Sequence, residues 1–415
     1  MGVAAVIAVV VLVGGLAVTG LPHRAGTPVA SGDGLAVPDR LYAVPDRMAA
    51  RRDDDSWARS EVTNDLTIGR GAAAWVMPEG LPVVVDAAEG AYHLLDLPGF
   101  SGNDRLTTLA QQPGLALSPD GRRLAYGYGD PGPQDDDRPV PSGVRVIDLE
   151  SGDVRTIPVT GGEGTVVGRL RFSPDGRWLV WVGRRLASWT EGSIGGGTSV
   201  AGRIAPGATT SEAMTGLGKG VEADMAGDVG IDDRGVVQVL TNRSLVAWDG
   251  RVLSRRRLAE ELLGPIAVRL DGSALAVSGS DGTALRRLDP ATGRITEVVN
   301  DGPYLDPVGW LEDDDTTLVV VKGGEFTTPT ALAIAGPDGV QTVARLEDGL
   351  PTPSIAVDLV SAEQPTVRRP APDWPWSDTA RTAAAVAAVV AAVVAALAAL
   401  LALRWARRRQ PRSPR

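Results

Sequence analysis

The amino-acid sequence predicts an all-β protein with an apolar segment at each end, and three observations support this prediction. A hairpin motif of apolar strand, Asp-Gly turn and apolar strand recurs through residues 66–346. An uncharged run of 21 residues lies near the C-terminus, and a second run of about 20 residues lies at the N-terminus. The chain has no cysteine among its 415 residues, which excludes disulfides, thiolate nucleophiles and Cys-ligated metals.

Residues 1–22 form the N-terminal apolar segment. Both a signal peptide and an uncleaved transmembrane helix fit its composition. It has no Lys/Arg-rich start, and its apolar core is long for a cleaved signal. Residues 23–65 follow as a linker that includes a short strand-like piece, Asp39–Val44.

Two copies of the hairpin motif, Leu115–Tyr126 and Leu170–Trp181, share the turn Ser-Pro-Asp-Gly. The proline presets φ for the turn, the aspartate can cap it, and the glycine supplies positive φ. We therefore assign a structural role to these turn residues and to a third Asp-Gly pair. They are Ser118, Pro119, Asp120, Gly121, Ser173, Pro174, Asp175, Gly176, Asp271 and Gly272.

Weaker copies of the hairpin give the repeat a period. Taken with the two strong copies, the acidic turn residues are Glu79, Asp120, Asp175, Asp233, Asp271 and Asp314. Their mean spacing is 47 residues, close to the length of a four-stranded propeller blade. A second motif, hydrophobic–Asp–x–x–Ser/Thr–Gly, follows some of the hairpins at Asp148 and Asp289, and more loosely at Asp86. It is expected to join the third and fourth strands of a blade.

The segment Phe-Ser-Pro-Asp-Gly-Arg-x-Leu at Phe172–Leu179, and nearly at Leu117–Leu124, resembles the repeat of TolB-like and WD40-like β-propellers. The resemblance covers about residues 66–346. Together with the apolar ends, the chain resembles actinobacterial membrane-anchored propeller proteins. This resemblance implies a fold and implies no activity.

The predicted fold is a seven-bladed β-propeller over residues 66–360, with six blades as the alternative. Six marked hairpins account for residues 66–346. Two strand-like pieces remain, Asp39–Val44 and Ser354–Val360, and propellers commonly close by pairing strands from both ends of the chain. The seventh blade is expected from that pairing.

The C-terminal part is predicted to be a Pro-rich stalk (361–382), a transmembrane helix (383–403) and a basic cytoplasmic tail (404–415). Residues 383–403 contain twelve Ala, five Val and four Leu, and as a helix they would span about 31 Å, the thickness of a bilayer core. The positive-inside rule places the C-terminus in the cytoplasm. The expected membrane-interface residues are Trp374, Trp376, Arg404, Trp405, Arg407, Arg408 and Arg409.

Charge supports an extracytoplasmic propeller that does not bind nucleic acid. The chain has a net charge of −10, and residues 1–24 and 404–415 contribute +1 and +6, so about −17 remains for the rest. An acidic domain disfavours both nucleic acid and anionic lipid surfaces. The predicted location is the cell membrane, with the propeller outside.

No catalytic, cofactor or metal site is predicted from the motifs. Three acidic triplets, Asp53–Asp55, Asp135–Asp137 and Asp313–Asp315, lack the spacing of a calcium loop. His93 is a lone histidine in an expected strand, and Walker A and Gly-x-Ser-x-Gly motifs are absent from the sequence.

The sequence therefore favours a non-enzymatic binding or scaffolding module for an envelope protein or a small ligand on the propeller face. Two alternatives remain. One is a propeller enzyme, a hydrolase or lyase, that uses a carboxylate-bound metal in the channel. The other is a purely structural envelope protein.

Overall fold

The computed structural model describes 34–49, 62–100, 114–129, 141–159, 165–186, 189–190, 193–194, 197–216, 228–241, 243–279, 282–299, 303–311, 316–323, 328–361, 365–372, 374 and 378–408. The chain divides into two compact units. One unit is Pro28–Ala371 and holds all the strands. The other consists of Met1–Thr27 and Pro372–Arg415 and contains the long helix α5.

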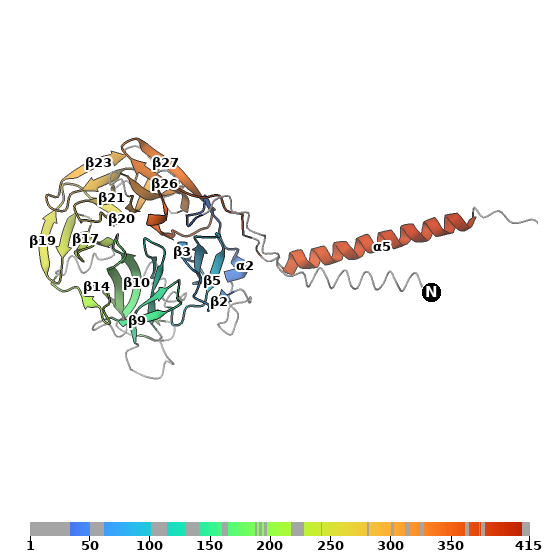
Figure 1. Cartoon of the computed structure of the whole chain (residues 1–415), viewed down its shortest axis with the longest axis horizontal. Coiled ribbons are helices and arrows are strands. Elements are labelled where there is room, and N and C mark those ends of the chain that lie inside the picture. The colour runs from blue at the N-terminus through green and yellow to red at the C-terminus, as the bar shows by residue number, and fades with distance from the viewer. Residues whose placement is uncertain are drawn as a thin grey trace, which may run out of the picture. The chain divides into compact units, whose positions relative to one another are not determined.

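The strands of the first unit form six sheets arranged around a ring, as Figure 1 shows, together with one short hairpin. This confirms the predicted all-β propeller.

Blades 2 to 5 are consecutive along the chain. Blade 2 is β6 (Leu115–Leu117), β7 (Arg123–Gly129), β8 (Ser142–Asp148) and β9 (Val154–Pro158). Blade 3 is β10 (Thr165–Phe172), β11 (Leu179–Leu186), β14 (Gly197–Ile204) and β15 (Glu212–Ala213), and the hairpin β12 (Trp189–Thr190) and β13 (Ser193–Ile194) lies between β11 and β14 in sequence. Blade 4 is β16 (Asp228–Ile231), β17 (Val237–Thr241), β18 (Ser244–Trp248) and β19 (Val252–Arg257). Blade 5 is β20 (Leu262–Val268), β21 (Leu275–Gly279), β22 (Leu285–Leu288) and β23 (Ile295–Val299).

Blades 1 and 6 each take a strand from the other end of the chain. Blade 1 is β28 (Ser354–Ile355), β3 (Gly71–Val76), β4 (Pro82–Asp86), β5 (Tyr92–Leu95) and β2 (Val62–Thr63). Blade 6 is β24 (Tyr304–Trp310), β25 (Thr317–Gly323), β26 (Thr328–Gly336), β27 (Gly339–Leu346) and β1 (Arg40–Leu41). The short helices are α2 (Asp46–Ala49) and η1 (Val357–Leu359).

The prediction of seven blades is wrong, because the two terminal pieces complete existing blades. The hairpin at Glu79 joins β3 to β4, which are the second and third strands of blade 1. The inner position of that blade is therefore open, and β28 fills it by pairing with β3. At the other end, β1 adds to the outer edge of blade 6 in parallel with β27.

The core lies between neighbouring blades. Each of five buried clusters combines side chains from two successive blades. Alternation along one strand explains the arrangement: Ile266 and Val268 of β20 pack toward blade 4, and Ala267 packs toward blade 6. Trp181 and Trp248 are almost fully buried in two of these clusters, as expected for blade-packing residues.

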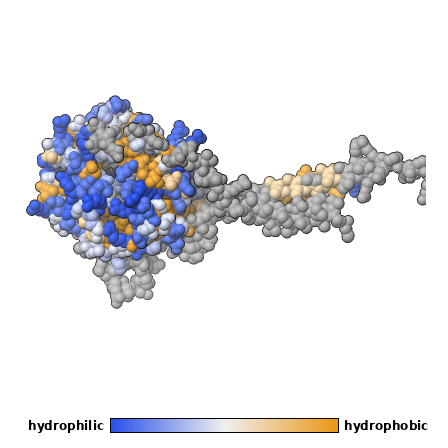
Figure 2. Space-filling view, viewed as in Figure 1, coloured by the Kyte–Doolittle hydropathy of each residue, from blue (hydrophilic) through white to orange (hydrophobic). Residues whose placement is uncertain are grey.

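In the second unit, α5 (Asp378–Arg408) is a 31-residue helix that includes residues 383–403. The large apolar side chains of α5 that the structure describes are 42% to 65% exposed and colour its surface as apolar in Figure 2. They are Val386, Val389, Val390, Val393, Val394, Leu397, Leu400 and Leu401. Within the part of the chain that is described, no helix qualifies by length and apolar character as a membrane span. The predicted N-terminal segment, residues 1–22, lies outside the described residues.

Candidate functional site

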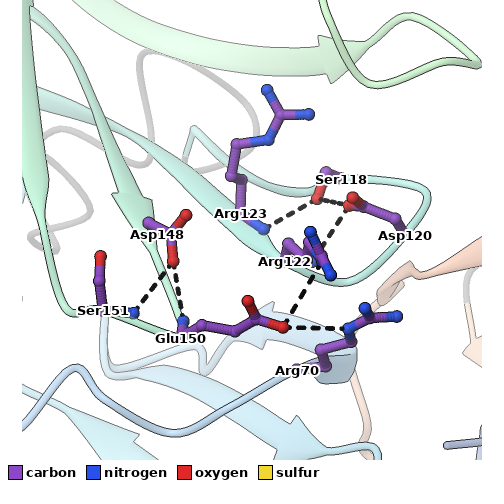
Figure 3. A network of polar contacts seen from close by, with 8 residues as sticks. All are labelled: Arg70, Ser118, Asp120, Arg122, Arg123, Asp148, Glu150 and Ser151. Carbon is purple, nitrogen blue, oxygen red and sulfur yellow. Dashed lines mark hydrogen bonds and ion pairs between the residues drawn. The ribbon is translucent and has the colours of Figure 1, made fainter.

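The Ser-Pro-Asp-Gly segments form closed turns at the end of the inner hairpins (Figure 3). In blade 2, the Ser118 hydroxyl donates to Asp120 Oδ1 at 2.6 Å and accepts the N–H of Arg123 at 2.9 Å. Asp120 Oδ1 also accepts the N–H of Arg122 at 3.1 Å. Gly121 has φ +72°, and the carbonyl of Pro119 accepts the N–H of Asp358. The Ser118 and Asp120 side chains therefore form hydrogen bonds with each other and with the backbone of their own turn.

The other predicted turns have the same chemistry. In blade 3, Ser173 bonds to Asp175 at 2.6 Å and accepts the N–H of Trp178 at 3.0 Å, while Gly176 has φ +67°. Asp271 accepts the N–H of Ser273 at 2.9 Å, and hydrogen bonds from that residue hold the pKa of the Asp271 carboxyl below its usual range. Gly272 has φ +70°. Pro174 lies in the blade 3 turn, between Ser173 and Asp175.

The second motif also makes turns. Asp148 Oδ1 accepts the N–H groups of Glu150 and Ser151 at 2.9 and 3.0 Å (Figure 3). Glu150 Oε1 forms ion pairs with Arg70 Nε of the preceding blade at 3.4 Å and with Arg122 Nε at 3.5 Å. These ion pairs are exposed, so each adds little to stability.

A central cavity of about 440 Å³ runs between the six inner strands, and residues of all six line it. Five of its polar side chains come from blades 3, 4 and 6 and form a partly buried polar belt, which we define as Arg171, Asp228, Tyr304, Asp306 and Lys322. Charged residues are rarely buried in a propeller core unless they are paired, so the contacts of this belt decide its role.

Asp228 and Arg171 form one half of the belt. Asp228 is 7% exposed, and its Oδ2 lies 3.4 Å from Arg171 Nη2 of blade 3. The same oxygen accepts the N–H of Ile266 in blade 5 at 2.6 Å. Asp228 thereby connects three blades. Arg171 Nη1 is buried and has no hydrogen-bond partner among the described residues.

Asp306 and Lys322 form the other half. Asp306 is 4% exposed, and its Oδ2 is paired with Lys322 Nζ. The ammonium also lies 5.4 Å from the centre of the Tyr304 ring. Asp306 Oδ1 is buried, and no residue that the structure describes forms a hydrogen bond with it. Burial raises the pKa of the Asp306 carboxyl, and Lys322 counteracts part of that effect.

The two halves act on each other electrostatically. Asp228 raises the pKa of Asp306 and Arg171 lowers it. Two ion pairs, Arg171 with Asp228 and Lys322 with Asp306, therefore lie in the wall of one polar cavity. A wall with both cationic donors and carboxylate acceptors suits a small polar ligand.

Sequence reasoning did not select any residue of this belt. A usable signal was present, since two arginines, Arg169 and Arg171, lie in the otherwise largely apolar inner strand β10, and Lys322 is one of two lysines in the sequence. The residues come from strands far apart in the sequence, so only the fold brings them together.

The remaining candidates lie elsewhere. His93 is half-buried in β5 opposite Val84, and burial lowers its pKa. The triplets Asp53–Asp55, Asp135–Asp137 and Asp313–Asp315 lie outside the described residues. Over the described ranges, no group of three or more acidic or histidine side chains is placed to hold a metal ion. Trp374, Arg404, Trp405, Arg407 and Arg408 are in the second unit, whereas Trp376 and Arg409 are not described.

Comparison with known proteins adds little beyond the fold. No protein-family profile matches the chain, and no curated protein matches it. Among solved structures, the chain is similar to TolB from Acinetobacter baumannii, with 16% sequence identity and a TM-score of 0.40. The match covers 71% of this chain and 68% of that one. A likeness this distant transfers neither an activity nor a partner.

Proposed function

We propose that the chain is a membrane-tethered binding module whose propeller lies on the extracytoplasmic side and takes a small polar ligand in its central channel. The observation that carries the proposal is the central cavity itself, which all six inner strands line and whose wall holds the ion pairs Arg171–Asp228 and Lys322–Asp306. An envelope protein bound on the propeller face remains a prediction from the sequence.

The chemistry of the belt favours binding over hydrolysis. The carboxylate of Asp228 is already engaged by Arg171 and by the N–H of Ile266, and that of Asp306 is engaged by Lys322. Each carboxylate therefore has a cation beside it that would compete with a metal ion. A guanidinium donor and a carboxylate acceptor instead match a ligand that carries both an anionic and a cationic or hydroxyl group.

The tether rests on the sequence of residues 383–403 and on the exposed valines and leucines along α5. A helix that is apolar all round is unstable in water unless something covers it. The arginines from Arg404 onward would then lie on the cytoplasmic side, and Trp374 and Trp376 at the outer interface.

Two experiments test the two halves of this proposal. For the tether, residues 1–22 are replaced by a cleavable export signal, and cells expressing this chain to Arg415 or only to Ser377 are fractionated. The chain that ends at Arg415 should stay with membranes after a carbonate wash, and the chain that ends at Ser377 should not. Equal membrane retention of both would contradict the C-terminal tether.

For the channel, the full chain in an uncharged detergent is melted in the presence of a panel of amino acids, hydroxy acids and simple amines. Compounds that carry both an acidic and a donor group should raise the melting temperature. Arg171→Met should abolish the shift, whereas Arg177→Met, at an arginine that is 67% exposed in the blade 3 turn, should retain it. A shift that persists in Arg171→Met would place the ligand elsewhere.

A further inference from the structure

A basic groove lies on the outer edge of blade 6, away from the channel. It has a volume of about 940 Å³ and is formed where β1, β27 and residues 368–371 meet. Its charged lining residues are Asp39, Arg40, Arg345, Arg368 and Arg369, and we refer to this set as the basic groove. Its described lining residues comprise four arginines and one aspartate, on a propeller that is strongly acidic as a whole.

Two of the arginines are direct neighbours in the sheet. Arg40 and Arg345 are register partners in the parallel pairing of β1 with β27. Like charges opposite each other on one sheet destabilise it. Both side chains are exposed, and neither forms an ion pair within the described part of the chain. Arg40 instead lies over the Tyr42 ring at 4.9 Å. The fold thus maintains a local excess of positive charge.

Arg369 adds a buried cation without a carboxylate. It is 6% exposed, and its Nη2 donates to the carbonyls of Gly34 and Ala87 at 3.0 and 3.1 Å. Its Nε and Nη1 are buried and have no hydrogen-bond partner in the described part of the chain. Gly90 allows this position, because a Cβ there would lie 2.8 Å from Arg369 Cγ. A buried charge with only neutral acceptors is costly unless an anion lies nearby.

The groove is also close along the chain to the proposed tether. Ala371 ends the groove, and α5 begins at Asp378. Seven fully extended residues reach about 25 Å at most. The proposed tether therefore follows the groove residues directly along the chain, which favours a ligand found at a membrane surface.

We propose that the basic groove binds the phosphate group of an anionic phospholipid headgroup on the outer leaflet, an inference that rests on the proposed membrane tether. Planar guanidinium groups bind phosphate oxygens in pairs, which suits the adjacent Arg40 and Arg345. Arg368 and Arg369 add positive charge to the wall. The Asp39 carboxylate repels an anion, so the groove suits a ligand with only one or two negative charges. Binding there would orient the acidic propeller, whose remaining charge disfavours an anionic surface.

The test uses the full chain in an uncharged detergent with three probes: dihexanoyl phosphatidylglycerol, dihexanoyl phosphatidylcholine and inorganic phosphate. Affinity is measured by calorimetric titration for the unmodified chain, for Arg40→Gln/Arg345→Gln, and for Arg251→Gln/Arg257→Gln. The last variant removes two exposed arginines near and on the outer strand of blade 4 and serves as the matched control. The groove variant removes a like-charge pair, so it should fold at least as well as the unmodified chain.

Phosphatidylglycerol should bind more tightly than phosphatidylcholine, and the groove variant should lose at least about tenfold in affinity while the control loses none. Equal binding of the two lipids, or an unchanged affinity in the groove variant, would overturn the proposal. Binding of inorganic phosphate but not of the lipid would identify a soluble ligand and overturn the lipid assignment. Failure of the tether itself would show separately, as loss of the exported chain that ends at Arg415 from membranes during fractionation.

Discussion

The ion pair of Lys322 with Asp306 gives the sharpest energetic prediction, through the variant Lys322→Met. Methionine keeps the length and apolar character of the lysine stem, so the change removes chiefly the charge. Asp306 is 4% exposed and its Oδ1 already lacks a partner, which leaves the carboxylate buried and alone. Removing one partner of such a pair typically costs about 3–5 kcal/mol.

Protonation of Asp306 sets an upper limit on that loss. The isolated carboxylate can avoid the free-energy cost of a buried charge by taking up a proton. At pH 7 this protonation costs about 4 kcal/mol, since the ordinary pKa of Asp is near 3.9 and each pH unit is worth ~1.4 kcal/mol. At pH 5 the same protonation costs only about 1.5 kcal/mol. The Lys322→Met variant should therefore lose up to about 4 kcal/mol of unfolding free energy at pH 7 and about 1.5 kcal/mol at pH 5.

The assay is urea unfolding of the full chain in an uncharged detergent, followed by tryptophan fluorescence at both pH values. The double variant Lys322→Met/Asp306→Asn carries no buried charge at these positions. It should lose less than Lys322→Met at pH 7 and show no added dependence on pH. Equal losses for Lys322→Met at the two pH values would refute the assignment of the penalty to Asp306.

Three further predictions concern the turns. Gly121→Ala should destabilise the protein more than Gly176→Ala. Both positions have positive φ, which costs an alanine ~1 kcal/mol. In addition, a Cβ at position 121 would overlap the Gly71 carbonyl of blade 1, whereas a Cβ at position 176 would contact the flexible Arg123 side chain. Ser173→Ala should cost about 1–3 kcal/mol in urea unfolding, because one backbone N–H loses its acceptor. Burial and neighbouring carboxylates raise the pKa of Asp233 to about 6, so the native state should lose stability as pH rises from about 4 to 6. Asp233→Asn should match the unmodified melting temperature at pH 4 and exceed it at pH 7.5.

The local structure could be predicted from the sequence because the turns carry their own chemistry. Ser118 to Gly121 and Ser173 to Gly176 contain the proline, the capping oxygen and the glycine that their turns require, so each hairpin is specified within a few residues. The repeat length then identified the blade. The propeller class follows from local patterns of this kind.

The closure and the channel could not be predicted, because both depend on pairing between distant segments. The motif at Glu79 has the same local form as the inner hairpins, yet it joins the second and third strands of its blade. Only the pairing of β28 with β3 reveals this. Likewise, Arg171 and Asp306 lie 135 positions apart, and no local pattern relates them.

Native mass spectrometry of the full chain, released from its own membranes in an uncharged detergent, tests the channel most directly. We expect a copurifying small molecule bound one to one, present in the unmodified chain and in Arg177→Met, and lost from Arg171→Met and Asp306→Asn. A bound species retained by both channel variants would contradict the channel as the binding site. A chain that carries no small molecule and gains none from the amino-acid and hydroxy-acid panel would contradict the proposed function.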